Sequence, residues 1–350
     1  MRILYVNVIE QNAGCGAEWF INRAFQELGH STHNIDFRKH RFSLYRKFLD
    51  APESDVLFVQ KGDGLPLALL KAVARPRFYW ACDILGLGAE DDLKELDPVY
   101  DRTQYRLLAS GLFEHVFLRT PNCIETVVSK GRAERKQCSI LSSGFDPRYH
   151  HPITNALKDI PVLFLGTPSA RRQEIIGRVD KIHPVQVLKA FGLEMTELMN
   201  RAKIVLNIHA GPVLDTETRV YEALGCGAFL LTERLSPENP FSNDDLVQFD
   251  SVEDLIDKIG YYLAHDQERQ AIATHGHQTA LAGHTYLHRA KQIVNTMSQY
   301  LKPNESSKPM IKHSLDLYAY AVSENMQRLR NSPVLDPIKR PIKTLLHRPS

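Results

Sequence analysis

The segment KIVLNIHAGPVLDTETRVYEALGCGAFLLTE, residues 203–233, has the pattern of a strand, a loop, a helix, a glycine turn and a second strand. Its β-branched run at 203–208 predicts a buried parallel strand. A helix is expected at 218–224, because glycines end it before the next apolar run at 228–231. Strand, helix and strand in this order predict an α/β fold with a parallel sheet.

The expected helix places a cation and a carboxylate side by side. Arg219 and Glu222 are three residues apart, so both lie on one face of the first turns, close to the helix start at Thr218. A carboxylate accepts hydrogen bonds from ribose hydroxyls, while an arginine and a helix N-terminus suit a diphosphate. We therefore expect a nucleotide site here. The alternative is an ordinary surface ion pair, which is common at this spacing.

Four further residues of the segment are assigned to the same donor site. Asn207 and His209 end the first strand, and ligands of parallel sheets bind at the carboxyl ends of strands. For His209, a structural hydrogen bond is the alternative. Gly225 and Gly227 form the turn that closes the helix.

A second glycine turn lies earlier in the chain. Gly166 follows the apolar run 162–165, and Arg171 and Arg172 follow shortly afterwards. A glycine lets the backbone approach a phosphate, and an arginine can neutralise a departing diphosphate without a metal ion. The alternative, two solvated arginines at a helix start, is disfavoured because cations there oppose the helix dipole.

Several segments carry a resemblance to one family, and they occur in that family's order. They are VLFVQKG (56–62), FYWACD (78–83), LSSGFDPRYHHP (141–152), VLFLGTPSARR (162–172), RVYEALGCGAFLLTE (219–233) and HTYLHRA (284–290). Together, over about residues 1–300, they resemble GT-B glycosyltransferases, in particular the spore-maturation-protein-like group of "glycosyltransferase family 1" proteins. The resemblance implies two Rossmann-like domains that face each other across a cleft.

The alternation of apolar and helical stretches supports the same organisation. Strands are expected at 3–8, 32–35, 56–59, 78–81 and 115–118, and again at 162–165, 203–208 and 228–231. We assign residues 1–152 to an acceptor-side domain and residues 153–301 to a nucleotide-sugar-binding domain. Residues 302–350 are expected to form a linker, a candidate cross-over helix and a basic tail. The tail either contacts an anionic membrane or is a frayed end.

The first domain contains the candidate acceptor-side residues. Gly14 and Gly16 follow the first strand, but the third glycine of a dinucleotide fingerprint is absent. The resemblance implies that this loop faces the cleft. Asp83 follows the strand at 78–81 and is the candidate catalytic base for an acceptor hydroxyl, with a turn-capping role as the alternative. Asp63, at a comparable strand end, is the substitute candidate.

Composition limits the remaining classes of function. A net charge of +2 over 350 residues does not favour a dedicated nucleic-acid binder. Five scattered cysteines without zinc spacing favour a reducing compartment, and no apolar run is long enough to span a bilayer. We expect a cytoplasmic enzyme with no metal and no cofactor.

The leading hypothesis is transfer of a sugar from a nucleotide diphosphate, a UDP-sugar being favoured, to an acceptor hydroxyl. The acceptor stays open among a glycan, a glycolipid, a protein and modified nucleic acid. A nucleotide-sugar epimerase on the same fold and a non-catalytic sugar- or nucleotide-binding protein are the alternatives. Retaining relatives carry two glutamates eight positions apart; Glu222 matches the second, but Leu214 stands at the first. Retention or inversion of the anomeric configuration therefore stays open.

Overall fold

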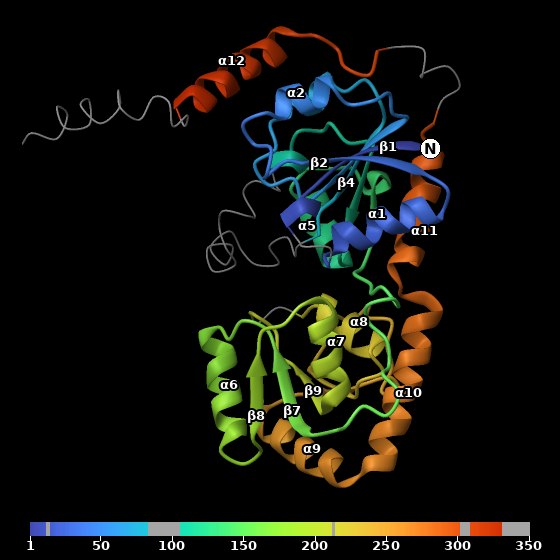
Figure 1. Cartoon of the computed structure of the whole chain (residues 1–350), viewed down its shortest axis with the longest axis vertical. Helices are drawn as coiled ribbons and strands as arrows, with labels where there is room; N and C mark the ends of the chain where they lie inside the picture. The colour runs from blue at the N-terminus through green and yellow to red at the C-terminus, as the bar shows by residue number, and fades with distance from the viewer. Residues whose placement is uncertain (12–14, 83–105, 212–213, 302–308, 331–350) are drawn as a thin grey trace, which may run out of the picture.

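Each half of the chain contains one parallel sheet. The structure, a computed structural model, describes residues 1–11, 15–82, 106–211, 214–301 and 309–330. Figure 1 shows the first sheet above the second along the long axis of the molecule. A two-domain α/β arrangement was expected from the alternation of apolar and helical stretches, and the two sheets confirm it.

The first sheet has six strands in the order β2-β1-β3-β4-β5-β6, all parallel. In the register of the sheet, Tyr5 of β1 lies opposite Asn34 of β2 and Phe58 of β3. The strands are β1 (Arg2–Asn7), β2 (Ser31–Asp36), β3 (Val56–Gln60), β4 (Arg77–Trp80), β5 (His115–Leu118) and β6 (Cys138–Ile140). The helices that alternate with them are α1 (Ala17–Glu27), α2 (Leu44–Leu49), α3 (Leu67–Ala72) and α5 (Pro121–Ser129).

The second sheet has five parallel strands in the order β11-β10-β9-β7-β8. Its strands are β7 (Ile160–Leu165), β8 (Val185–Leu188), β9 (Ala202–Asn207), β10 (Leu230–Glu233) and β11 (Val247–Phe249). Its helices are α6 (Ala170–Asp180), α7 (Gly192–Arg201), α8 (Thr218–Gly225), α9 (Val252–Ala264) and α10 (Asp266–Gly283).

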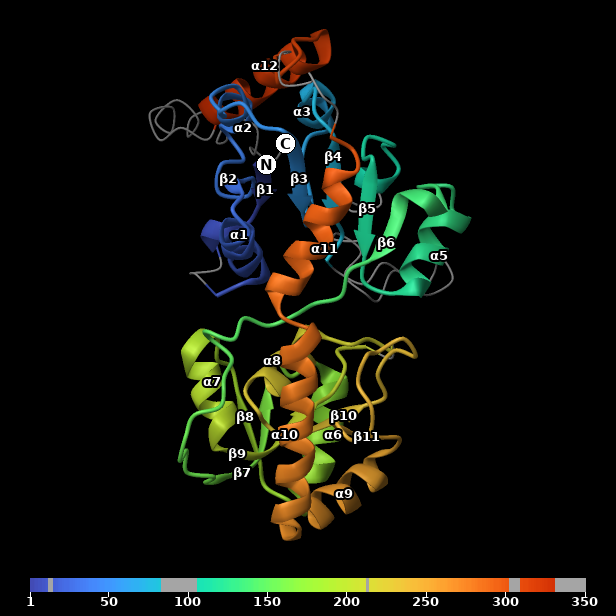
Figure 2. The ribbon, with the colours of Figure 1, turned by 90° about the vertical axis from the view of Figure 1, so that its right-hand side faces the viewer.

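The chain passes between the two sheets twice, and the two crossings are hydrogen-bonded to each other. The backbone N–H of Phe145 donates to the carbonyl of His284 at 3.3 Å, and the N–H of Tyr286 donates to the carbonyl of Phe145 at 2.9 Å. After the second crossing, α11 (Tyr286–Ser298) packs against α1 on the first sheet. Figure 2 shows α10 along the second sheet and α11 along the first.

A last helix, α12 (Leu315–Arg330), also lies on the first half of the molecule. The segment before it is hydrogen-bonded to the end of α3 and the residues that follow, because Ala74 N–H donates to Met310 O and Lys312 N–H donates to Ala72 O, both at 2.7 Å. Leu317 of α12 is buried in the core of the first sheet. Helix α11 belongs to the range 153–301 assigned to the second domain, yet it packs on the first sheet. The domain boundaries at residues 152 and 301 therefore remain predictions.

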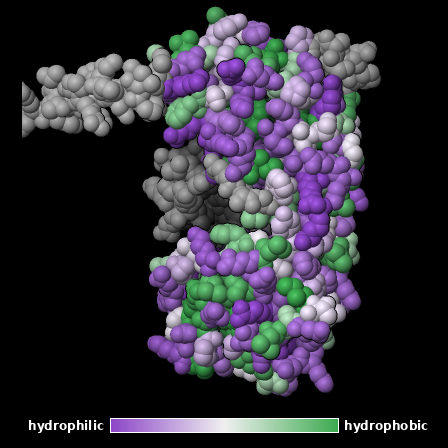
Figure 3. All heavy atoms as spheres, viewed as in Figure 1, coloured by the Kyte–Doolittle hydropathy of each residue, from purple (hydrophilic) through white to green (hydrophobic). Residues whose placement is uncertain are grey.

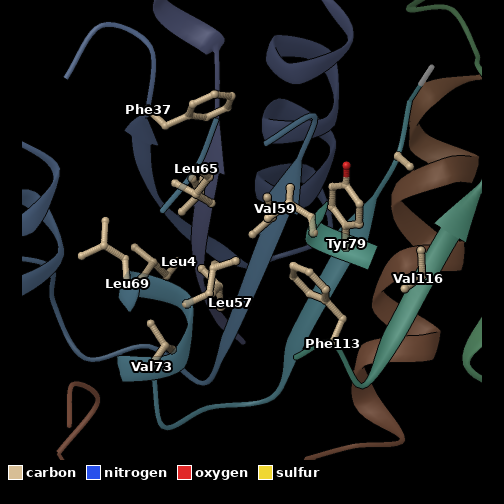
Figure 4. Close-up of a cluster of buried hydrophobic side chains, with 14 of the residues drawn as sticks. Leu4, Phe37, Leu57, Val59, Leu65, Leu69, Val73, Tyr79, Phe113 and Val116 are labelled. Carbon is tan, nitrogen blue, oxygen red and sulfur yellow. The ribbon is translucent and has the colours of Figure 1, made fainter. Parts of the chain in front are cut away.

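Each sheet is covered by apolar side chains on both faces. In β3, Leu57 and Val59 enter one hydrophobic cluster while Val56 and Phe58 enter the other. This alternation follows from the two-residue period of a strand, and burial on both faces is typical of parallel sheets. Figure 4 shows part of the first cluster, with Leu57, Val59 and Tyr79 packed together. The second sheet has the same two-sided core.

The expected strands are present, with ends that differ by one or two residues. The structure adds three strands that the sequence did not indicate: β6, β8 and β11. Each of the three lies at an edge of its sheet. β6 and β11 have only three residues each and β8 is largely exposed, so none of the three presents a clear apolar run.

Candidate functional site

A cavity of about 920 Å³ lies between the two sheets, at the carboxyl ends of their strands. Figure 3 shows the surface hollowed between the upper and lower parts of the molecule. Predicted site residues on its wall are Gly16 from the first half and Gly166, Arg172, Asn207, His209, Thr218, Arg219 and Glu222 from the second. Residues far apart in the sequence are therefore brought to one place, which is where open α/β sheets bind ligands.

Helix α8 presents its charged pair to the cavity. Arg219 Nη1 lies 2.9 Å from Glu222 Oε2, and both side chains are less than a fifth exposed. Arg219 also contacts the sulfur of Met195. On the far side of Glu222, its Oε1 lies 3.9 Å from Nε2 of the buried His150. The carboxylate thus lies between Arg219 and His150 and forms part of the cavity wall.

The start of α8 is joined to the first crossing of the chain. Thr218 Oγ1 and Ser143 Oγ form a hydrogen bond of 2.9 Å. Gly225, at the other end of α8, packs against Phe145: a Cβ added there would lie 2.4 Å from the ring. Gly227 has a φ of 63°, the left-handed conformation that favours glycine after a helix. Neither Gly225 nor Gly227 lies on the cavity wall.

Of the two neighbouring arginines, Arg172 faces the cavity, beside Gly166. Its Nε donates to Ile208 O at 2.8 Å and its Nη1 donates to Thr167 O at 3.2 Å, which fixes the plane of the guanidinium. Arg171 instead pairs with Glu233 and donates to His209 O at 3.0 Å. The two arginines of the sequence motif therefore have different partners.

His209 is buried, and both ring nitrogens have defined neighbours. Nε2 lies 2.9 Å from Arg234 O, so it carries a proton, and Nδ1 lies 3.5 Å from Glu217 Oε1. Burial alone lowers the pKa of His209, but Glu217 and the carbonyl outweigh it and the pKa is raised. For the acid Glu217 the effects are opposite: burial raises its pKa, but His209 and Arg172 bring the pKa below its ordinary value. The neighbouring Asn207 donates to Thr232 Oγ1 at 3.0 Å.

An ion pair that the sequence did not indicate joins the two halves across the cavity. Arg119, directly after β5, donates from Nη2 to Asp215 Oδ2 at 2.7 Å and to Thr216 O at 3.2 Å. Its Nη1 donates to Cys82 O at 3.2 Å. Both side chains are largely buried, with 12% of Arg119 and 4% of Asp215 exposed. The position of Arg119 after a strand is the signal that could have identified it.

The first-half wall contains a second pair that sequence reasoning missed. Lys61 Nζ lies 3.1 Å from Oε1 of Glu18, whose side chain is almost completely buried. Lys61 has a φ of 65°, an uncommon conformation for a residue other than glycine. Asp63 is turned elsewhere, because it forms a bidentate pair with Arg38. Gly14 and Asp83, the candidate base, lie outside the described residues.

The described residues contain no group of three or more His, Cys, Asp or Glu side chains that could hold a metal ion. All five cysteines lie within the described residues and are present as thiols rather than in disulfides. Within the same described ranges, no helix combines the length and the apolar character that crossing a bilayer requires.

Comparisons with known proteins agree with the geometry. A family model described as "Glycosyl transferase-like" matches residues 150–295, and no curated protein matches the chain. Among solved structures, sucrose-phosphate synthase from Thermosynechococcus elongatus aligns with a TM-score of 0.63 and 12% identity, covering 85% of this chain and 98% of that one. HepE from Anabaena, solved with UDP-glucose, aligns with a TM-score of 0.62 and 14% identity, covering 85% and 100%.

A glycosyltransferase from Rickettsia africae aligns with a TM-score of 0.59 and 10% identity over 87% of this chain and 99% of that one. At such identities the likeness establishes the fold, which is the GT-B fold expected from the sequence. The family match covers residues 150–295, which include most of the second-half wall, and its description is that of a glycosyl transferase. Two facing parallel sheets, a cavity between them and this match identify the chain as a glycosyltransferase with the GT-B fold.

Proposed function

We propose that the chain transfers a sugar from a nucleoside diphosphate, a UDP-sugar being favoured, to an acceptor hydroxyl. The observation that carries this proposal is the placement of Glu222, Arg219 and Arg172 together on the second-half wall of the cavity. A carboxylate and two guanidinium groups are what a ribose and a diphosphate require. The complex of HepE with UDP-glucose supports a donor of this class on the same fold.

In this proposal, Glu222 accepts hydrogen bonds from the ribose hydroxyls. Arg219 already holds the Oε2 of Glu222 at 2.9 Å, so the carboxylate is oriented before the donor binds. Preorganisation of this kind lowers the cost of binding. The diphosphate then lies near the start of α8, where the helix dipole favours negative charge.

Arg172 is the proposed cation for the diphosphate. Its Nη2 is 3.7 Å from Glu217 Oε2, a separation longer than a hydrogen bond. A phosphate oxygen can therefore bind Nη2 while Nε and Nη1 keep their carbonyl partners. Phe191, on the same wall and 61% exposed, offers its ring to the nucleobase.

We propose that the reaction needs no metal ion, because the arginines and the start of α8 supply the positive charge that the leaving diphosphate requires. Product formation should persist in EDTA. Complete loss in EDTA, restored by manganese or magnesium, would contradict this part of the proposal while leaving the donor site intact.

The acceptor is proposed to enter along the first-half wall, opposite the donor. Asp83 stays the candidate base for an inverting reaction, and NMR of the product's anomeric centre separates inversion from retention. A glycan, a glycolipid, a protein and modified nucleic acid remain the acceptor classes. Membership of the spore-maturation-protein-like group, a cytoplasmic location and membrane contact by the basic tail are further parts of this proposal.

A thermal-shift screen with UDP-, GDP-, dTDP- and ADP-sugars tests the donor, because a ligand that binds the folded protein raises its melting temperature. Glu222→Gln should weaken donor binding by about 1–3 kcal/mol in calorimetry, the scale of a hydrogen bond to a charged group. Glu238→Gln is the matched control, since Glu238 is exposed and lies off the cavity wall. Unchanged affinity in Glu222→Gln would refute the ribose assignment. Product mass without acceptor distinguishes transfer from epimerisation.

A further inference from the structure

Helix α12 has apolar side chains on two opposite faces. Its inner face, with Leu317 and Ala321, is buried against the first half of the molecule. Large apolar side chains also point outward: Leu315 is 87% exposed, Tyr318 50%, Val322 57% and Met326 52%. Spacings of three and four residues place these four on one face of the helix.

We call these four outward residues the α12 stripe. An exposed apolar stripe of this kind marks an interaction surface rather than scattered surface residues. It is about 16 Å long, at 1.5 Å of rise per residue. Figures 1 and 2 place α12 at the end of the molecule away from the second sheet, beside α2.

The surface next to the α12 stripe is basic. Residues 38–50 contain five lysines and arginines and one acidic residue, Asp50. Three of these cations form ion pairs, Arg38 with Asp63, Lys39 with Glu10 and Arg46 with Asp50, so the excess positive charge of the segment comes mainly from Arg41 and Lys47. Arg41, Arg46 and Lys47 of this segment are exposed. Arg46 of α2 and Arg328 of α12 border the same groove between the two helices. Contact between the helices is direct, because Tyr45 N–H donates to the buried carboxylate of Glu324 at 3.2 Å.

We propose that the α12 stripe and the basic segment around α2 together dock the protein on an anionic lipid surface. An apolar helix face flanked by cations is the pattern of a helix that lies in the membrane interface. Each nearby lysine or arginine adds attraction to anionic lipids that salt weakens. A second copy of the chain is the weaker fit, because four side chains on one helix supply far fewer than the roughly 20–30 residues of a standard interface.

Flotation of the full-length protein with lipid vesicles tests the proposal. We expect binding to vesicles of phosphatidylcholine with phosphatidylglycerol, little binding to phosphatidylcholine alone, and loss of binding in high salt. Val322→Glu should weaken binding about tenfold or more, since it removes the burial of one apolar side chain. Ile182→Glu is the matched control, because Ile182 is equally exposed, at 60%, but follows α6 in the second half.

Lys47→Glu should also weaken vesicle binding and should reduce its salt dependence. Unchanged binding of Val322→Glu, with an unchanged melting temperature, would overturn the proposal. Loss of binding only when Lys339, Arg340 and Lys343 are changed to serine would assign the contact to the tail instead. The stripe would instead be assigned to a second copy of the chain if two results were obtained together: the native protein does not bind vesicles, and it forms a concentration-dependent dimer in light scattering that Val322→Glu abolishes.

Discussion

Replacing Arg119 with methionine should open the cavity rather than unfold the protein. Arg119 and Asp215 come from opposite halves of the molecule, and the pair closes the cavity with an Nη2–Oδ2 distance of 2.7 Å. Methionine keeps the length of the side chain and removes its charge. Asp215, 4% exposed, is then left without its guanidinium partner in the closed arrangement.

Removing one partner of a buried ion pair costs about 3–5 kcal/mol, because the remaining charge is desolvated without compensation. The two sheets have separate cores, so Asp215 can regain water if the two halves move apart. Most of this penalty should therefore weaken closure of the two halves and donor binding, and a smaller part should lower the free energy of unfolding. We expect Arg119→Met to weaken donor binding by at least tenfold and to increase the radius of gyration in solution scattering.

The titration of Asp215 provides a second signature. Burial raises the pKa of Asp215, and Arg119 opposes that rise, so the pKa should climb further in Arg119→Met. A carboxyl whose folded pKa is raised destabilises the folded, closed state as pH rises through that pKa. The defect of Arg119→Met should therefore shrink as pH falls, when Asp215 becomes neutral.

A double-mutant cycle with Asp215→Asn tests the reasoning. The neutral amide no longer requires a cation, so adding Asp215→Asn to Arg119→Met should recover part of the lost donor affinity. Calorimetry at two pH values and solution scattering on all four proteins give the coupling. A coupling energy below about 0.5 kcal/mol, the limit for independent sites, would refute the cross-cavity clamp.

Three further predictions concern the second-half wall. Arg172→Ala should weaken binding of a sugar nucleotide more than binding of the bare nucleoside. Arg171→Ala loses only the pairing with Glu233 and His209 O, so it should affect both ligands equally. Equal losses for both ligands in Arg172→Ala would show that Arg172 does not bind the diphosphate. Phe191→Ala should cost about 1–3 kcal/mol in nucleotide affinity if its ring stacks on the base, with an unchanged melting temperature. Calorimetry should then show weaker binding of uridine but unchanged binding of ribose phosphate, and an equal loss for both ligands would place the contact of Phe191 elsewhere. Because the pKa of His209 is raised, its contribution to the free energy of unfolding is fully present below about pH 6.5 and is lost as pH rises through the raised value. His209→Gln should therefore flatten the pH dependence of the free energy of unfolding in denaturation experiments, and an unchanged pH dependence would mean that another group titrates.

Much of the fold could be predicted from the sequence because its signals are local. The apolar run of β9, the turn after α8 and the apolar strand β10 all lie within residues 203–233, where periodicity and glycine chemistry act over a few residues. The side chains of Arg219 and Glu222 share a helix face for the same reason. The edge strand β2 was predicted, but β6 and β11 have only three residues each and β8 is largely exposed, so these three strands carry too short or too weak an apolar pattern to be recognised.

The wall of the cavity was decided by contacts between distant parts of the chain. Nothing local distinguishes Arg171 from Arg172; Glu233 binds one of them and thereby leaves the other to the cavity. Arg119 and Asp215 meet only because two separate sheets face each other, and the pairing of Glu18 with Lys61 depends on α1 lying over the end of β3. Strands, helices and their ends follow from neighbouring residues in the sequence, whereas the partner of each charged side chain follows from burial, which only the packed molecule determines.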